Sequence, residues 1–146
     1  MNTVSALRGR MRPAPLTRRV LGGLFLGVLS MTAFSQPAAN KDMVTLEQAR
    51  ADHEAGKVVL IDIREPMEHA NGVAKGAKLL PMSQLRQRVG EIPTDPSKPV
   101  YLICNTQNRS SATLRALREH GYSHVRYVNG GMSSWALRGW PMVRPQ

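Results

Sequence analysis

The sequence predicts an α/β domain in which helices cover both faces of a mostly parallel sheet. Short apolar runs rich in Val, Ile and Leu alternate along the chain with segments of helical pattern. Two of these runs are almost unbroken in their apolar character, which is typical of central strands buried on both sides. Strands that alternate with helices need crossover connections, and such connections make neighbouring strands parallel.

Four apolar runs are the expected strands. They cover residues 58–62, 77–80, 100–104 and 124–128. The first expected helix spans residues 46–55, because Thr45 and Gln48 have the spacing of a capping box and Gly56 follows. Further helices are expected to begin near Pro66, at residues 83–85, after Arg109 and after the Gly130-Gly131 pair.

The composition limits the classes of protein that fit. The chain has 146 residues, of which 42% are hydrophobic and 21% are charged. These values exclude a disordered polymer and a polytopic membrane protein, and the length fits one domain with a short appendage. A single cysteine excludes an intrachain disulfide framework and a multi-cysteine metal site. Two histidines four residues apart on one helix, such as His120 and His124, can bind a metal, but Gly121 should end the helix between them. We therefore expect neither a metal nor another cofactor.

Residues 1–35 have the pattern of a secretory signal peptide. They contain five arginines and no acidic residue, and an uncharged apolar run covers residues 20–34. Ala33 and Ser35 are small residues at the positions that a signal peptidase reads, which predicts cleavage before Gln36. The expected location is the periplasm or another compartment outside the cytoplasm. The run is short for a membrane span, so anchoring by an uncleaved leader is the alternative, and the export route stays open.

After the leader, residues 36–42 are expected to form a linker and residues 43–146 the folded domain. The whole chain has a formal charge of +10, but five of the positive charges belong to the leader. The remaining 15 basic and 10 acidic residues are intermixed, without the clustered basic stripe of a nucleic-acid surface. Nucleic acid is therefore not an expected partner.

The one cysteine, Cys104, stands where an expected strand ends and an expected helix is about to begin. Main-chain N–H groups in such a loop can form an anion-binding nest, and the helix N-terminus adds partial positive charge. A sulfur placed there ionises easily, and Arg109 adds a fixed cation nearby. The alternative is that Cys104 is a small buried hydrophobic residue, which is the commoner role of a free cysteine.

The loop resembles the rhodanese active-site pattern C-x-x-G-x-R-S, which it matches at Cys104, Arg109 and Ser110. Three further motifs of that family occur in the family's order. They are D-x-R-E-x-x-E at residues 62–68, the glycine positions of G-H-I-x-G-A at Gly72 and Gly76-Ala77, and a strand, Gly-Gly turn and Trp-bearing helix at residues 125–135. The resemblance covers residues 43–142, which is almost the whole expected domain.

This resemblance implies a single rhodanese-like domain with about five strands, in which Cys104 carries a persulfide. It implies a sulfurtransferase that moves a sulfane sulfur from a donor such as thiosulfate to cyanide or a thiol acceptor, with ping-pong kinetics. The main-chain N–H groups expected to hold the terminal sulfur belong to Asn105, Thr106, Gln107, Asn108 and Arg109. Asp62, Arg64 and Ser110 are expected to support the loop.

Two departures from the family pattern leave the level of activity open. Gln107 occupies the position of a glycine, so a positive φ there would strain the loop, and otherwise its side chain is expected over the mouth of the pocket. Val73-Ala74 replaces the family's His-Ile, which removes a histidine from the wall of the site. A catalytically weak or inactive module that binds a partner or carries a persulfide is therefore the first alternative.

The length of the loop argues against a second alternative, a phosphatase or an arsenate reductase. Arg109 follows Cys104 by five positions, whereas those related enzymes have one residue more in the loop. His53 and His69 are expected to be ordinary surface residues. The sequence leaves the donor, the acceptor and the oligomeric state open.

Overall fold

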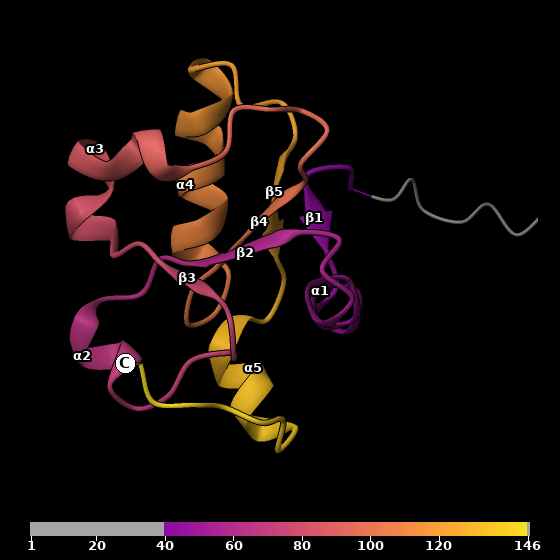
Figure 1. Cartoon of the computed structure of the whole chain (residues 1–146), viewed down its shortest axis with the longest axis vertical. Coiled ribbons are helices and arrows are strands. Elements are labelled where there is room, and N and C mark those ends of the chain that lie inside the picture. Colours follow the sequence, from indigo (N-terminus) through magenta and orange to yellow (C-terminus); the bar gives the residue numbers. More distant parts are fainter. Residues whose placement is uncertain (1–39, 146) are drawn as a thin grey trace, which may run out of the picture. The chain divides into compact units, whose positions relative to one another are not determined.

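The structure of the chain, a computed structural model, describes residues 40–145. The expected signal peptide at residues 1–35 and residues 36–39 of the expected linker lie outside the described residues. Five strands form one sheet in the order β1-β5-β4-β2-β3, and every neighbouring pair is parallel (Figure 1). The strands are β1 (Met43–Val44), β2 (Val59–Asp62), β3 (Lys78–Leu79), β4 (Val100–Ile103) and β5 (Val125–Val128).

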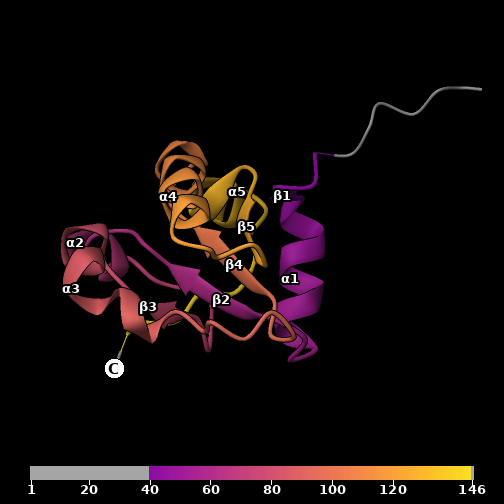
Figure 2. The same cartoon turned by 90° about the horizontal axis from the view of Figure 1, so that it is seen from above.

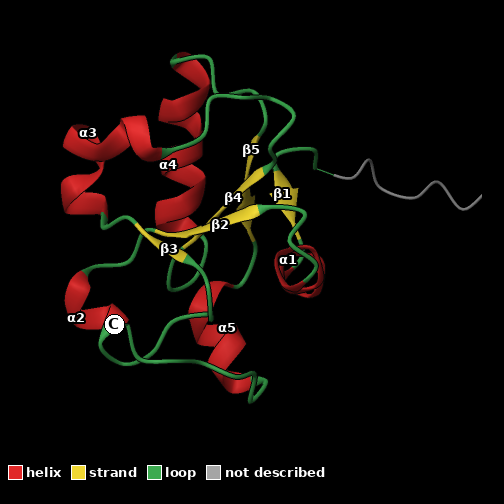
Figure 3. Ribbon diagram, viewed as in Figure 1, coloured by secondary structure: helices red, strands yellow, loops and turns green. Residues whose placement is uncertain are grey.

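Helices connect the strands and complete the α/β architecture that the sequence predicts (Figure 3). They are α1 (Leu46–Glu54), α2 (Pro66–His69), α3 (Leu85–Arg88), α4 (Asn108–Glu119) and α5 (Gly131–Leu137), with short 3-10 helices at Met82–Gln84 and Val89–Glu91. The expected α/β class is therefore confirmed. Within residues 40–145, no helix combines the length and the apolar character that crossing a bilayer requires.

The sheet is buried on both faces, as its apolar strands predict. Along β4, the side chains of Tyr101 and Ile103 join one core cluster, and those of Val100 and Leu102 join the other, because successive residues of a strand point to opposite faces. The first cluster includes buried residues of α1 and α5, and the second includes buried residues of α4 and the half-buried Leu85 of α3. Figure 2 shows α1 and α3 on opposite sides of the strands.

Strand β1 is the element that the sequence does not predict. It has two residues, Met43 and Val44, which pair with Tyr127 and Val128 of β5. A segment this short shows no periodicity of its own, so the strand exists because β5 offers it a free edge. Just before it, Asp42 accepts a hydrogen bond from Arg118, so the end of the expected linker contacts the domain.

The helices begin and end largely for the reasons that the sequence suggests. Thr45 caps α1, and its Oγ1 accepts a hydrogen bond from the main-chain N–H of Gln48. Helix α4 begins at Asn108, before Arg109 rather than after it, and ends just before Gly121, which has φ +86°.

The carboxyl ends of β2 and β4 lie side by side in the sheet, because Asp62 is in register with Ile103. The chain leaves β2 toward α2, and it leaves β4 through the loop that begins at Cys104. In parallel sheets this edge is where ligands bind. The fold therefore brings the two polar segments that the sequence singles out to one place.

Candidate active site

Cys104 lies at the carboxyl end of β4 and is only 1% exposed. Its Sγ lies 3.5 Å from Oγ of Ser110, in the first turn of α4. The Ser110 hydroxyl in turn donates a hydrogen bond to the main-chain carbonyl of Gln107, at 3.1 Å. A thiolate at position 104 could accept the Ser110 proton instead, so Ser110 is placed to serve either protonation state of the sulfur.

Main-chain hydrogen bonds from the N-terminus of α5 hold the loop that follows Cys104. The main-chain N–H of Met132 donates to the carbonyl of Cys104 at 2.8 Å, and that of Ser133 donates to the carbonyl of Asn105 at 2.9 Å. In a trans peptide the C=O and the N–H point in opposite directions. Because these two carbonyls face α5, the N–H groups of Asn105 and Thr106 point away from it.

Gly131 makes this close approach possible. It has φ +57°, and a Cβ at this position would overlap the main-chain carbonyl oxygens of Cys104 and Thr106. Only glycine leaves room for the loop to lie on α5 at this backbone conformation. The Gly-Gly turn therefore shapes the cysteine loop, although Gly131 lies 27 positions farther along the chain.

The amide groups of the loop are available to a ligand. Within residues 40–145, the main-chain N–H groups of residues 105–110 donate no hydrogen bond. The last three of them belong to the first turn of α4, where N–H groups have no partner inside the helix. Asn105, Thr106 and Asn108 are exposed, while Gln107 and Arg109 are half-buried. An anion bound over this loop would find several donors and the positive end of the helix dipole.

The backbone conformation of Gln107 answers whether this position needs a positive φ, which the sequence left open. Its φ is −153°, so the residue does not require the left-handed region that favours glycine. The loop is therefore compatible with glutamine at this position, and the strain expected for a positive φ is absent.

Arg109, which the sequence predicts to be a fixed cation near Cys104, is paired with a carboxylate. Its Nη1 and Nη2 atoms lie 2.7 and 2.6 Å from the two carboxylate oxygens of Glu68 in α2. Hydrogen bonds from Arg109 are the main reason why the pKa of Glu68 falls from 4.5 to about 2. The carboxylate is consequently ionised at neutral pH, and the pair joins the cysteine loop to α2.

A second ion pair lies beneath α2. Asp62 is fully buried at the end of β2, and its carboxylate accepts hydrogen bonds from Nε and Nη2 of Arg64, the shortest at 2.7 Å. Arg64 also donates to the main-chain carbonyls of Glu68 and Gly72, at 3.3 and 2.8 Å. The buried pair thus holds the C-terminal end of α2, which contains Glu68, and the turn that follows it.

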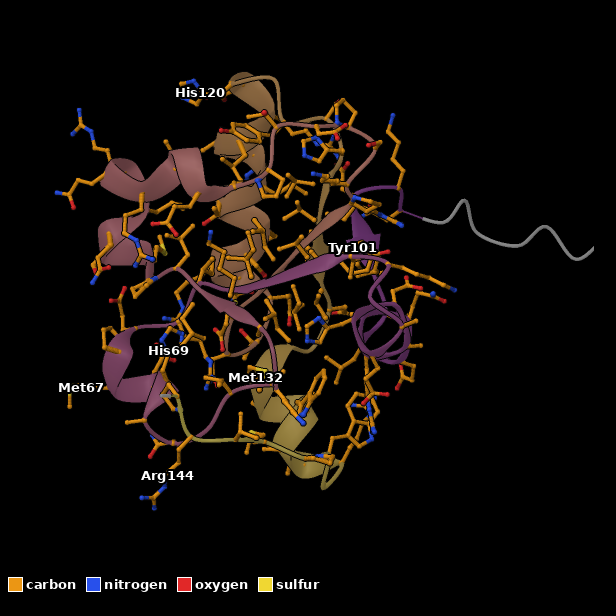
Figure 4. The ribbon with its side chains drawn as sticks, in the orientation of Figure 1. Met67, His69, Tyr101, His120, Met132 and Arg144 are labelled. Carbon is orange, nitrogen blue, oxygen red and sulfur yellow. The ribbon has the colours of Figure 1, made fainter. Side chains whose placement is uncertain are left out.

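The expectation that His69 lies at the surface is wrong. The side chain is buried, with Nε2 at 3.4 Å from Oδ1 of Asp62 and without a hydrogen-bond partner in the described part of the chain. In Figure 4, His69 lies between α2 and the sheet, whereas Met67 projects into solvent. A single histidine in a short polar segment gives no periodic signal of burial, so only the packing of α2 reveals its position.

The structure brings the expected residues together and adds three to which the sequence analysis gave no role in the site. Cys104, Ser110, Asp62 and Arg64 are buried around the ends of β2 and β4. The additions are Glu68, His69 and Gly131. Glu68 belongs to the D-x-R-E-x-x-E motif, so that motif was the signal for its role. No group of three or more potential metal ligands occurs among the residues that the structure describes.

Comparisons with known proteins identify the family of this chain. The rhodanese-like domain family matches residues 45–138. A sulfurtransferase from Allochromatium vinosum is 38% identical over 105 residues, which cover 72% of this chain and 94% of the relative. The uncharacterized protein YqhL of Bacillus subtilis is 42% identical over 92 residues, which cover 63% of this chain and 70% of the relative.

Solved structures show the same fold. A rhodanese-related protein from Thermoplasma volcanium superposes with a TM-score of 0.63 and 27% identity, over 70% of this chain and 98% of that protein. Reduced CoADR-RHD of Bacillus anthracis superposes with a TM-score of 0.59 and 36% identity, over 65% of this chain and 16% of that protein. From the match of the family over most of the described residues, this chain belongs to the rhodanese-like domain family.

Proposed function

We propose that this protein is a sulfurtransferase that carries a sulfane sulfur as a persulfide on Cys104. The observation that carries the proposal is the position of this thiol, directly before a run of main-chain N–H groups that have no acceptor within residues 40–145. These donors and the N-terminus of α4 would stabilise the negative charge of a terminal persulfide sulfur. The similarity to a sulfurtransferase of Allochromatium vinosum supports the same reaction class.

The chemistry needs no cofactor. The Cys104 thiolate attacks the outer sulfur of a donor such as thiosulfate, so that a bond from Sγ to that sulfur forms and the S–S bond of the donor breaks. Sulfite leaves with the electron pair of the broken bond. A second nucleophile, cyanide or a thiolate, then attacks the terminal sulfur, and the electron pair returns to Sγ. This two-step exchange predicts ping-pong kinetics.

The burial of Cys104 is part of this proposal. Because Cys104 is only 1% exposed, its sulfur can meet a donor only when the residues that cover it move. The loop that follows Cys104 exposes Asn105, Thr106 and Asn108, so movement of this loop is one way to open the site. Loop movement of this kind is common in enzymes and protects a reactive intermediate from water.

The same burial favours a second candidate, an inactive rhodanese-like module that binds a partner. A cysteine shielded by Leu114 and Leu117 of α4 also fits a purely structural role. The two candidates differ in the reactivity of the sulfur. A structural Cys104 reacts with alkylating agents only as fast as the domain unfolds, whereas a catalytic Cys104 reacts in the folded state.

The decisive experiment is to incubate the purified protein with thiosulfate and to measure its intact mass. We expect a gain of one sulfur atom, which added cyanide removes as thiocyanate. Since Cys104 is the only cysteine of the chain, Cys104→Ser is a complete control and should show neither change. A wild-type protein that gains no sulfur from thiosulfate or from an organic persulfide would instead support the inactive module, and turnover of an aryl phosphate would support a phosphatase.

We also propose that the protein is exported and processed before Gln36. Production of the full chain in a bacterial host, followed by mass measurement of the protein in the periplasmic fraction, tests this. A chain that keeps residues 1–35 and sediments with membranes would support the anchored alternative.

A further inference from the structure

The charged side chains that are linked to one another near the cysteine loop have a negative net charge, whereas the whole chain is positively charged. The chain has a formal charge of +10. Near the loop, Arg109 is paired with Glu68, and Arg64 is paired with Asp62. Glu65 adds a further negative charge that acts on Arg109, and its carboxylate accepts hydrogen bonds from the main-chain N–H and the hydroxyl of Ser83, which carry no charge.

These five linked side chains therefore sum to a formal charge of −1. Among residues 40–145, no other Lys or Arg side chain makes an ion pair with the three carboxylates. His69, which lies beside Asp62, would bring the sum to zero if it were protonated. The site thus has no surplus cation, and a Cys104 thiolate adds one more negative charge.

We infer that Glu68 sets the donor specificity of this loop, by neutralising Arg109 and so favouring sulfur donors that carry little negative charge. The inference rests on the proposed function and narrows it. Thiosulfate carries two negative charges, whereas an alkyl thiosulfonate such as methanethiosulfonate carries one and delivers the same sulfane sulfur. The structure points to the second class, together with persulfides of neutral thiols, as the better substrates.

The contact geometry explains why Glu68 acts through Arg109. The two short hydrogen bonds occupy one N–H of each terminal guanidinium nitrogen, and both side chains are about one-third exposed. An anionic donor must compete with a carboxylate that α2 holds in place, since Glu68 also accepts a hydrogen bond from the main-chain N–H of Glu65. Glu68 is therefore a positioning residue that touches the cation and not the reacting sulfur.

The first test measures charge without relying on turnover. Iodoacetate and iodoacetamide have nearly the same shape and differ by one negative charge, so the ratio of their rates with Cys104 reports the local potential. The measurement is made at about pH 8, above the ordinary range of histidine titration, and in about 0.15 M salt, which screens charges beyond about 8 Å. We expect Glu68→Gln to raise the iodoacetate to iodoacetamide ratio about three- to tenfold, the effect of one unit charge at several ångströms.

Two variants serve as controls. Glu68→Asp keeps the charge and should keep the wild-type ratio. Glu91→Gln removes a carboxylate that is also ion-paired, with Arg88 and Lys78, but that does not contact Arg109. Hydrogen bonds from Arg88 and Lys78 lower the pKa of Glu91 to about 2, so Glu91, like Glu68, is ionised at the pH of the measurement. It should leave the ratio unchanged, and an equal rise in Glu91→Gln would overturn the inference.

The second test uses the donors themselves. We expect the ratio of kcat/KM for thiosulfate to that for methanethiosulfonate to rise about three- to tenfold in Glu68→Gln, chiefly through KM for thiosulfate. If both donors transfer sulfur and neither ratio changes, the inference about Glu68 is wrong while the proposed function stands. If neither donor transfers sulfur, the proposed function fails. If Cys104 is then still alkylated in the folded protein, an unchanged alkylation ratio in Glu68→Gln overturns the inference separately, and if it reacts only on unfolding, the inference fails together with the proposed function.

A measurement on the wild-type protein covers the case in which Glu68→Gln does not fold. The iodoacetate to iodoacetamide ratio of Cys104 is compared with that of N-acetylcysteinamide, a thiol with no charged neighbour. A site of negative balance predicts a lower ratio for the protein. An equal or higher ratio would show that the main-chain donors, the helix dipole and Arg109 together outweigh the carboxylates, and it would overturn the inference.

Discussion

Replacement of Gly131 by alanine tests how the cysteine loop is shaped. The added Cβ would overlap the carbonyl oxygens of Cys104 and Thr106, so the loop must move away from α5. Movement of the loop breaks the hydrogen bonds that Met132 and Ser133 donate to it. We therefore expect a less stable protein whose sulfur is no longer held in the geometry of the site.

The size of the effect follows from these contacts. Alanine at a φ of +57° costs about 1 kcal/mol in the backbone, and two lost hydrogen bonds cost about 1 kcal/mol each. The free energy of unfolding of Gly131→Ala should therefore fall by roughly 3 kcal/mol. Gly56→Ala is the matched control, because Gly56 has φ +67° and nothing within 4 Å of an added Cβ, so only the backbone cost of about 1 kcal/mol remains.

Equilibrium unfolding in urea measures both free energies, and the thiosulfate assay measures sulfur transfer by the folded proteins. Gly131→Ala should lose most of its transfer activity, and Gly56→Ala should keep it. If the two variants were equally stable, the overlap with the loop would carry no energy. The role assigned to Gly131 would then be incorrect.

Three further predictions concern the polar residues of the site. Ser110→Ala should lower sulfur transfer about tenfold and the free energy of unfolding by about 1 kcal/mol, because a buried hydrogen bond is lost. Ser111→Ala is the control: it loses a similar but exposed hydrogen bond to the main chain and should change sulfur transfer little. Asp62→Asn should lower the free energy of unfolding in urea by about 3 kcal/mol, because it leaves Arg64 buried without its counter-charge. A decrease of less than about 1 kcal/mol would contradict this. Glu68→Gln should cost about 1 kcal/mol at neutral pH, a value reduced for partial exposure of the pair. Because the pKa of Glu68 is lowered from 4.5 to about 2, its stabilising effect is complete above pH 4.5 and is lost as the pH falls toward 2, so unfolding curves of wild type and variant should converge there.

Local patterns account for most of the fold. The expected strand at residues 58–62 appears as β2 (Val59–Asp62), and that at residues 100–104 appears as β4 (Val100–Ile103). Continuous apolar runs of this length have few alternatives in an α/β chain, because they must be buried on both faces. The two-residue β1 could not be predicted, since its conformation is imposed by pairing with β5.

The candidate site divides along the same line. The position of Cys104 between a strand and a helix can be derived from residues that are neighbours in the chain. The bridge from Arg109 to Glu68 joins residues 41 positions apart, and the support of the loop by Gly131 spans 27 positions. No pattern of apolar and polar residues encodes such contacts, because they depend on which strands lie side by side in the sheet.

Sequence alone establishes the parallel sheet, the family resemblance and the thiol at the end of a strand, because each is encoded in short segments. Tertiary structure alone decides that Cys104 is buried, that Arg109 is already neutralised and that His69 lies beside Asp62. The reason is that the net charge of a site and the access of solvent to it depend on side chains from several segments of the chain. The final charge and access are set only once β2 and β4 lie next to each other and Glu68 of α2 has paired with Arg109.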